Sequence, residues 1–197
     1  MTTKILRRAL FGFAVAAGTF TVVTHSWAAP PPTNATVFVN LADPDYCIGV
    51  YGGATSDLSS LVLWQCDGSA NQTWVTDNSF SANTFFYMND SAATSMCASL
   101  YGGNVANGTP LILWTCDGGY DQAWQFISQP VAPPYSGHAQ CYTISNMAAF
   151  EDMYNPDQVI GVDGGNIRDG ADIVLWSFFN DPVNHPDQYW CVFDGPV

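Results

Sequence analysis

The feature that most constrains this chain is an internal repeat with a period of 50 residues. At that shift a cysteine, a Tyr-Gly-Gly turn, a Leu-x-Leu-Trp run, a Cys-Asp-Gly turn and a Gln-x-Trp motif coincide between Cys47–Trp74 and Cys97–Trp124. A divergent third copy holds Ile160-Gly161-Val162-Asp163-Gly164-Gly165, Ile173-Val174-Leu175-Trp176 and Gln188-Tyr189-Trp190. One such unit cannot bury its apolar face alone, so the three must pack together.

Each copy has the pattern of about four short strands. Alternating apolar runs are separated by Gly, Pro and Asp-Gly segments, which favour turns. Three units of four strands predict an all-β fold, a disulfide-bonded β-trefoil with three pseudo-symmetric four-strand repeats. We place the repeats at about 36–80, 81–130 and 138–197 within a single domain, 36–197.

The N-terminus has the pattern of a signal peptide. Lys4, Arg7 and Arg8 precede an apolar stretch of 10–23, and Ala28 ends a small-x-small cleavage sequence. We therefore expect residues 1–28 to be removed on secretion and residues 29–35 to be a proline-rich leader. The apolar stretch is too short for a comfortable membrane span, so no span is predicted.

Charge and cysteine content bound the partners and the compartment. Beyond residue 28, Arg168 is the single Lys or Arg against 17 acidic residues, a formal charge of −16. Such a surface repels nucleic acid and anionic lipid, which proteins bind through Lys and Arg. All six cysteines lie in this part of the chain, and an even count behind a signal peptide predicts three disulfides in an extracellular setting.

The three Gln-x-Trp motifs, each preceded by a Leu-Trp strand, resemble the ricin-B-type (R-type) lectin domain over roughly residues 36–193. The resemblance implies that the Gln and Trp of each motif are structural. These residues are Gln72, Trp74, Gln122, Trp124, Gln188 and Trp190. It also implies one disulfide inside each of the first two repeats. The expected pairs are Cys47–Cys66 and Cys97–Cys116, which leave Cys141 and Cys191 to pair; Val159 and Phe178 replace the third repeat's cysteines.

In R-type domains a sugar site joins a carboxylate, placed two residues after the repeat's first cysteine, to an aromatic platform and a nearby polar group. Here Gly49, Ser99 and Gly161 stand at the carboxylate position. The retained candidates are the Trp of each Leu-Trp pair, the residue before each Gln-x-Trp and one substitute acceptor in the third copy. They are Trp64, Trp114 and Trp176, then Asn71, Asp121 and Asp187, and finally Asp163.

These features predict a carbohydrate-binding protein with up to three weak sugar sites and no cofactor. The alternative is an interaction module that has lost sugar binding, such as a secreted toxin subunit or protease inhibitor with a protein partner. A glycosidase would need two positioned carboxylates, which no motif singles out. A calcium site at Asp163, Asn166, Asp169 and Asp172 is not favoured, because their spacing matches no known loop. We therefore expect neither an enzyme nor a metal site.

Overall fold

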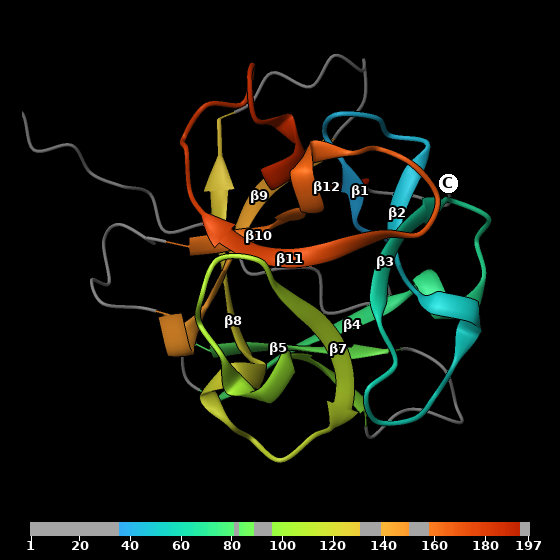
Figure 1. Ribbon diagram of the computed structural model, residues 1–197, viewed down its shortest axis with the longest axis vertical. Helices are drawn as coiled ribbons and strands as arrows, with labels where there is room; N and C mark the ends of the chain where they lie inside the picture. The colour runs from blue at the N-terminus through green and yellow to red at the C-terminus, as the bar shows by residue number, and fades with distance from the viewer. Residues whose placement is uncertain (1–35, 81–82, 89–95, 131–138, 150–157, 194–197) are drawn as a thin grey trace, which may run out of the picture.

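The protein folds as a twelve-stranded β-trefoil (Figure 1). The computed structural model describes residues 36–80, 83–88, 96–130, 139–149 and 158–193. The expected signal peptide, the leader and most of the connector between the second and third repeats lie outside the described residues. No helix within the described ranges is long and apolar enough to cross a membrane.

Each repeat contributes four strands, as the sequence predicted. The first has β1 (Val39–Asn40), β2 (Tyr46–Val50), β3 (Leu61–Gln65) and β4 (Trp74–Phe80). The second has β5 (Asn83–Met88), β6 (Met96–Leu100), β7 (Thr109–Thr115) and β8 (Ala123–Gln129). The third has β9 (Ala139–Asn146), β10 (Gln158–Val162), β11 (Ala171–Ser177) and β12 (Trp190–Phe193).

Within the described residues, seven short 3-10 turns connect the strands. They are η1 (Tyr51–Gly53), η2 (Ala70–Gln72), η3 (Tyr101–Gly103), η4 (Tyr120–Gln122), η5 (Met147–Ala149), η6 (Asp163–Gly165) and η7 (Pro186–Gln188). Three of them, η1, η3 and η6, are the glycine-rich turns of the repeat. Another three, η2, η4 and η7, end at the glutamine of each Gln-x-Trp motif.

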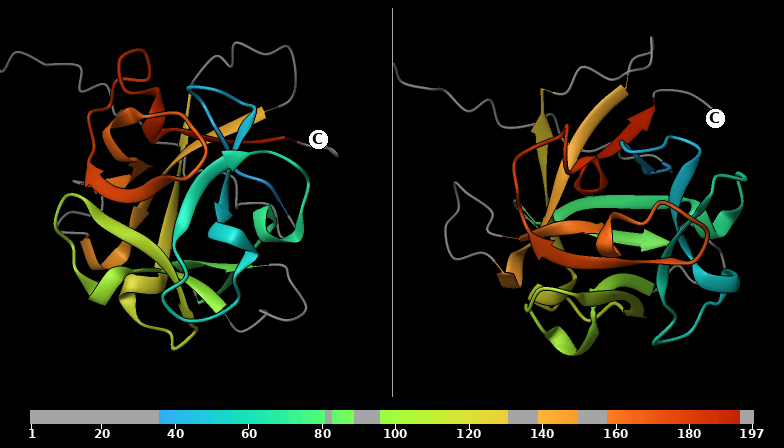
Figure 2. Two further views of the ribbon diagram at one scale, coloured as in Figure 1. Left: turned by 45° about the vertical axis from the view of Figure 1, so that its right-hand side comes forward. Right: turned by 45° about the horizontal axis from the view of Figure 1, so that its top comes forward.

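Six strands form the barrel, and three hairpins cover one end of it (Figure 2). Antiparallel pairing runs through β1, β12, β9, β8, β5 and β4. A bridge between Thr36 and Trp74 joins the two ends of this series. The hairpins β2–β3, β6–β7 and β10–β11 meet one another where β11 pairs with both β3 and β7. Each repeat therefore touches both of the others, which places equivalent loops at three related positions.

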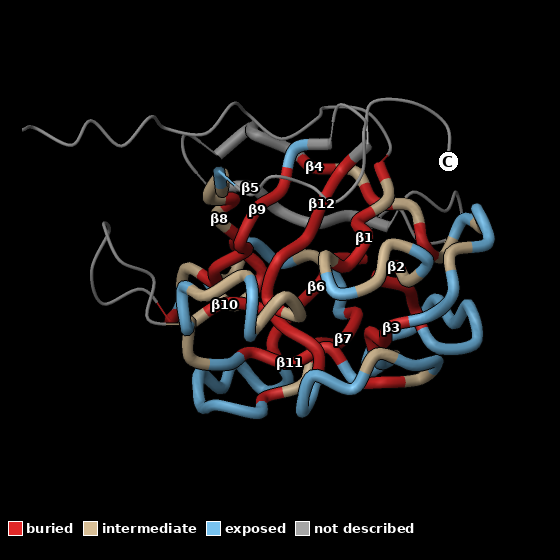
Figure 3. The backbone as a smooth tube through the Cα atoms, turned by 90° about the horizontal axis from the view of Figure 1, so that it is seen from above, coloured by how far each residue is buried: buried red, intermediate tan, exposed pale blue. Residues whose placement is uncertain are grey.

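The tryptophans of the three Gln-x-Trp motifs fill the core. Trp74, Trp124 and Trp190 are completely buried. Their indole N–H groups donate to the backbone carbonyls of Ile48, Ala98 and Ile160 at 3.0, 3.0 and 3.1 Å. A buried Trp needs such an acceptor, because its N–H would otherwise lose its bond to water. Figure 3 shows the result, with buried strands inside and exposed residues gathered in the connecting loops.

Three disulfides reinforce this arrangement. Cys47–Cys66 and Cys97–Cys116 lie inside the first two repeats, and Cys141–Cys191 joins the neighbouring strands β9 and β12. In the third repeat Val159 is fully buried where Cys47 and Cys97 stand in the others. Phe178, at the position of the second cysteine, packs against Tyr189 with ring centroids 6.1 Å apart. Apolar contacts thus occupy the place of the missing bridge.

Candidate functional site: a surface around one tryptophan in each repeat

One tryptophan of each repeat reaches the surface at the end of a hairpin strand. Trp64, Trp114 and Trp176 are 38%, 36% and 37% exposed, although the leucine before each is fully buried. This contrast follows from the alternation of side chains along a strand. Each indole is thus partly packed and partly open to solvent.

The turn before each Gln-x-Trp motif carries a polar residue and packs against the first strand of the hairpin, β2, β6 or β10. In the second repeat this residue is Asp121, and the following Gln122 fixes the turn. The Gln122 side chain accepts a hydrogen bond from the Asp117 amide and donates one to the Thr115 carbonyl, both at 2.9 Å. Asn146 donates to the Asp121 carbonyl at 2.9 Å, so the turn is held from β9 as well.

The other two turns are fixed in the same way. Gln72 bonds Asp67 and Gln65 across the first turn at 2.8 and 2.7 Å. Gln188 bonds Phe179 and Ser177 across the third at 3.1 and 2.7 Å. All three glutamine side chains are buried. The motif's glutamine therefore positions the residue before it, and this explains why the two recur together.

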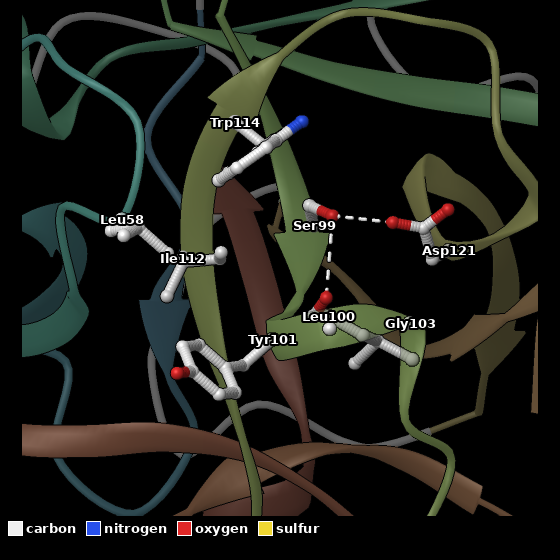
Figure 4. A pocket seen from close by; sticks show the side chains of 9 residues that line it. Leu58, Ser99, Leu100, Tyr101, Gly103, Ile112, Trp114 and Asp121 are labelled. Carbon is white, nitrogen blue, oxygen red and sulfur yellow. Dashed lines mark hydrogen bonds between the residues drawn. The ribbon is translucent and has the colours of Figure 1, made fainter.

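In the second repeat these parts enclose a hollow of about 370 Å³ (Figure 4). The Ser99 hydroxyl donates to the Asp121 carboxylate at 2.6 Å. Trp114 borders the same hollow, together with Tyr101 and Ile112. A carboxylate, a hydroxyl and aromatic faces thus surround one shallow space.

The third repeat has a larger hollow of about 590 Å³ that includes Trp176, Asp163 and Asp187. Burial raises the pKa of Asp187, while its own backbone N–H and the nearby His185 act in the opposite direction. His185 lies stacked on Phe179, with ring centroids 4.0 Å apart. This site therefore offers two carboxylates and an additional aromatic surface.

The small residue at the family's carboxylate position makes room for the carboxylate of the turn. A Cβ added to Gly161 would lie 3.3 Å from an Asp187 carboxylate oxygen. Ser99, at the same position in the second repeat, is the residue that bonds Asp121. Strands β6 and β10 have no carboxylate at this position, but the facing turns η4 and η7 place Asp121 and Asp187 in the hollows.

The first repeat keeps an amide where the others have a carboxylate. Asn71 accepts a hydrogen bond from the Ser69 hydroxyl at 2.6 Å and donates to the Val50 carbonyl at 3.3 Å. Tyr51 meets Trp64 edge to face, with centroids 6.3 Å apart. This surface can form hydrogen bonds but has no charged acceptor on its turn.

Several residues of these hollows were not among the sequence-based candidates. Leu58 and Tyr101 border the second, and Phe179, Asn184 and His185 border the third. The insertion after Phe178 was visible in the sequence, but its place in the same hollow as Trp176 was not. Two acidic residues of the hairpin loops bond the backbone of a neighbouring repeat and do not line either hollow. Asp57 accepts from the Thr115 amide at 2.7 Å and Asp169 from the Gln65 amide at 2.9 Å, so both tie neighbouring repeats together.

The closed trefoil, its three Gln-x-Trp motifs and the exposed tryptophan of each repeat define a lectin-like β-trefoil. A family model described as the ricin-type beta-trefoil lectin domain matches residues 34–146. The chain belongs to this family, as its repeats indicated. The match covers the first two repeats and the first strand of the third, and the structure adds the rest of the third. A comparison with curated proteins gives no match.

Solved structures show the same fold at low sequence identity. The designed three-fold symmetric protein ThreeFoil has a TM-score of 0.66 at 16% identity, covering 82% of this chain and 99% of its own. A ricin B-like lectin from Macrolepiota procera in complex with lactose has 0.60 at 14%, covering 85% and 100%. An exo-beta-1,3-galactanase from Clostridium thermocellum has 0.65 at 21%, covering 83% of this chain but only 30% of that enzyme. Family and fold together support a carbohydrate-binding module.

Proposed function

We propose that this protein is a secreted lectin that binds carbohydrate at the surfaces around Trp114 and Trp176, with a weaker site around Trp64. The observation that carries the proposal is the second-repeat hollow, where the Asp121 carboxylate stands beside Ser99 and the exposed indole of Trp114. Secretion is supported by the signal-like residues 1–28 and by the three disulfides, which form in oxidising compartments.

The chemistry of the hollow suits a sugar ring. A pyranose has an apolar face of C–H groups that can lie on an indole, and vicinal hydroxyls that can donate to one carboxylate. A hydrogen bond to an ionised carboxylate is about twice as strong as a neutral one. The protein contributes a fixed acceptor and a fixed platform, and its role is binding without chemical change of the ligand.

Affinity at each surface is expected to be weak, because the hollows are shallow and each supplies few polar groups. Three surfaces related by the threefold arrangement of repeats can still engage a branched or repeated glycan together. Linked binding events of this kind raise overall affinity by orders of magnitude without new contacts. The natural ligand is therefore a polyvalent glycan or glycoconjugate.

The test is a glycan-array screen of the oxidised protein, followed by titration of the best ligand. Asp121→Asn removes the charge of the acceptor but keeps its shape, and we expect it to weaken the second site about tenfold or more. Trp114→Ala should weaken it to a similar degree. Asp45→Asn changes an equal charge at an exposed position outside both hollows, and should leave binding unchanged. A blank array with a folded protein would refute the proposal.

A protein partner is the second candidate, favoured by the loop after Phe178. Phe179 and Val183 are 48% and 83% exposed there, which is unusual for large apolar side chains grouped on one loop. Were the array blank, Phe179→Ser and Val183→Ser variants would be compared with the unchanged protein in pull-downs from the host's secreted proteins. Loss of one defined partner in these variants would establish the alternative.

A further inference from the structure

One residue of each long hairpin loop reaches the exposed tryptophan of a neighbouring repeat. The backbone N–H of Leu58 donates to the Leu113 carbonyl at 2.9 Å. By the same contact, Gly108 donates to Leu175 at 2.8 Å, and Gly170 donates to Leu63 at 2.9 Å. The acceptor in each case is the leucine immediately before the exposed tryptophan. The three loop residues are therefore equivalent under the threefold arrangement of repeats.

All three residues have a positive φ, but only two are glycine. The φ angles are 69° at Leu58, 84° at Gly108 and 76° at Gly170. This backbone region costs an L side chain free energy, whereas glycine enters it freely. Leu58 is also 57% exposed, so burial in the core does not account for it. A strained, largely exposed leucine at this one position calls for a functional explanation.

The position of Leu58 is on the edge of the second-repeat hollow. Figure 4 shows Leu58 beside Ile112 on one side of β7, with the hydrogen-bonded Ser99 and Asp121 on the other. The equivalent glycines show how close this position is to the platform. A Cβ added to Gly108 would lie 3.4 Å from the Trp176 ring, and one added to Gly170 would lie 3.8 Å from the Trp64 ring.

We propose that Leu58 is a specificity-determining residue that makes the second-repeat site select saccharides carrying a methyl group. This inference rests on the proposed sugar-binding function. A sugar hydroxyl turned toward Leu58 and Ile112 would lose bonds to water and find no partner. A methyl group in the same place, from an N-acetyl group or a 6-deoxy carbon, removes apolar surface from water instead. At the equivalent positions of the other two surfaces, Gly108 and Gly170 have no side chain to offer.

The experiment is an NMR titration that follows the Trp114 indole N–H, so the second site is read separately from the other two. The ligands are matched pairs that differ by one substituent: galactose with N-acetylgalactosamine, galactose with 6-deoxygalactose, and glucose with N-acetylglucosamine. We expect a methyl-bearing member to bind about fourfold more tightly than its partner, the factor given by burying one methyl-sized group. Which pair shows the preference identifies the methyl source.

Two variants test the role of the side chain itself. Leu58→Gly gives the second site the residue found at the other two, and Leu58→Asn keeps bulk with a polar end at a position where asparagine tolerates positive φ. In both variants the two members of the ligand pair should bind with about equal affinity. A preference unchanged in Leu58→Gly would overturn this inference and leave the proposed function intact. No shift of the Trp114 signal with any glycan, including the best array ligand, would overturn this inference together with the proposed sugar site at Trp114, whereas a blank array would overturn the proposed function as a whole.

Discussion

At the scale of single residues, a small side chain on the hairpin strand leaves space for a carboxylate from the facing turn. Gly161 and Ser99 leave space that Asp187 and Asp121 enter from the turn. An aspartate at both places would bring two like charges together in a small hollow, which disfavours ionisation of both. The hollows of the second and third repeats therefore each keep a turn carboxylate, which is the proposed acceptor.

The strain at Leu58 predicts an unusual response to mutation. Leu58→Gly removes an exposed apolar side chain and relieves the positive φ, while it makes the unfolded chain more flexible. These effects are each about 1 kcal/mol and oppose one another. We expect the free energy of unfolding in urea to change by less than about 1 kcal/mol. Leu63→Ala, in the fully buried position, should cost about 2–5 kcal/mol. A large loss in Leu58→Gly would show that Leu58 serves packing.

Asp187 should make stability depend on pH in a defined direction. Burial raises the pKa of its carboxyl above the ordinary value of 3.8 in the folded protein. Between the two pKa values the unfolded state binds fewer protons, so this residue lowers stability as pH rises through that window. Asp187→Asn should therefore unfold at higher urea concentration than the unchanged protein at neutral pH, and the difference should disappear below about pH 3.8. Solvent screening of the half-buried group keeps the effect modest.

The control for this measurement is Asp45→Asn, which removes the same charge from an exposed loop. It separates a local burial effect from relief of the general negative charge. If both variants raised neutral-pH stability equally, repulsion across the whole surface would be the cause, and the assignment to Asp187 burial would be wrong.

At the scale of elements, the turns η2, η4 and η7 connect the core to the sites. The buried glutamine of each turn holds it closed, and the polar residue before it is partly exposed. The core-filling tryptophan follows two positions after the glutamine. One short motif thus specifies core packing and also places the residue that we propose binds the ligand.

This connection predicts that Gln122→Ala affects both stability and binding. The Asp117 amide and the Thr115 carbonyl would lose their partner, which costs about 1–3 kcal/mol. Because Asp121 is held by the same turn, binding at the second site should weaken as well. Gln140→Ala breaks bonds of an exposed glutamine on β9 and should change stability by less than about 0.5 kcal/mol. Urea unfolding and titration of both variants would check this.

The repeat made the fold predictable, but the sites only in part. Period, turn residues and alternation gave the strand number and the trefoil, because they depend on local sequence. The positions of Trp64, Trp114 and Trp176 on strands followed from the same pattern. The approach of Leu58 to the second hollow could not be foreseen, because it depends on contact between repeats. The supply of the carboxylate from the facing turn also required the three-dimensional distance between Gly161 and Asp187.

At the scale of the whole molecule, cooperativity depends on how the third repeat closes onto the first. Strand β12 pairs with β1 on one side and β9 on the other, and so joins the start of the fold to its end. The Cys141–Cys191 disulfide lies in this place and spans 50 residues, whereas the bridges within the first two repeats each span 19. The third repeat lacks a bridge equivalent to Cys47–Cys66 and Cys97–Cys116, and its one disulfide, Cys141–Cys191, joins its first strand to its last.

The number of residues that each disulfide encloses predicts how much free energy of unfolding it contributes. In the loop-closure model, a bridge stabilises by restricting the unfolded chain, and the restriction grows with the number of residues enclosed. Replacing both cysteines of Cys141–Cys191 by alanine should cost about 4 kcal/mol, and the same change at Cys97–Cys116 about 3 kcal/mol. Urea unfolding of the two double variants measures the difference directly. An equal or larger loss at Cys97–Cys116 would mean that packing around the bridge in the folded state, and not closure of the chain, determines its contribution.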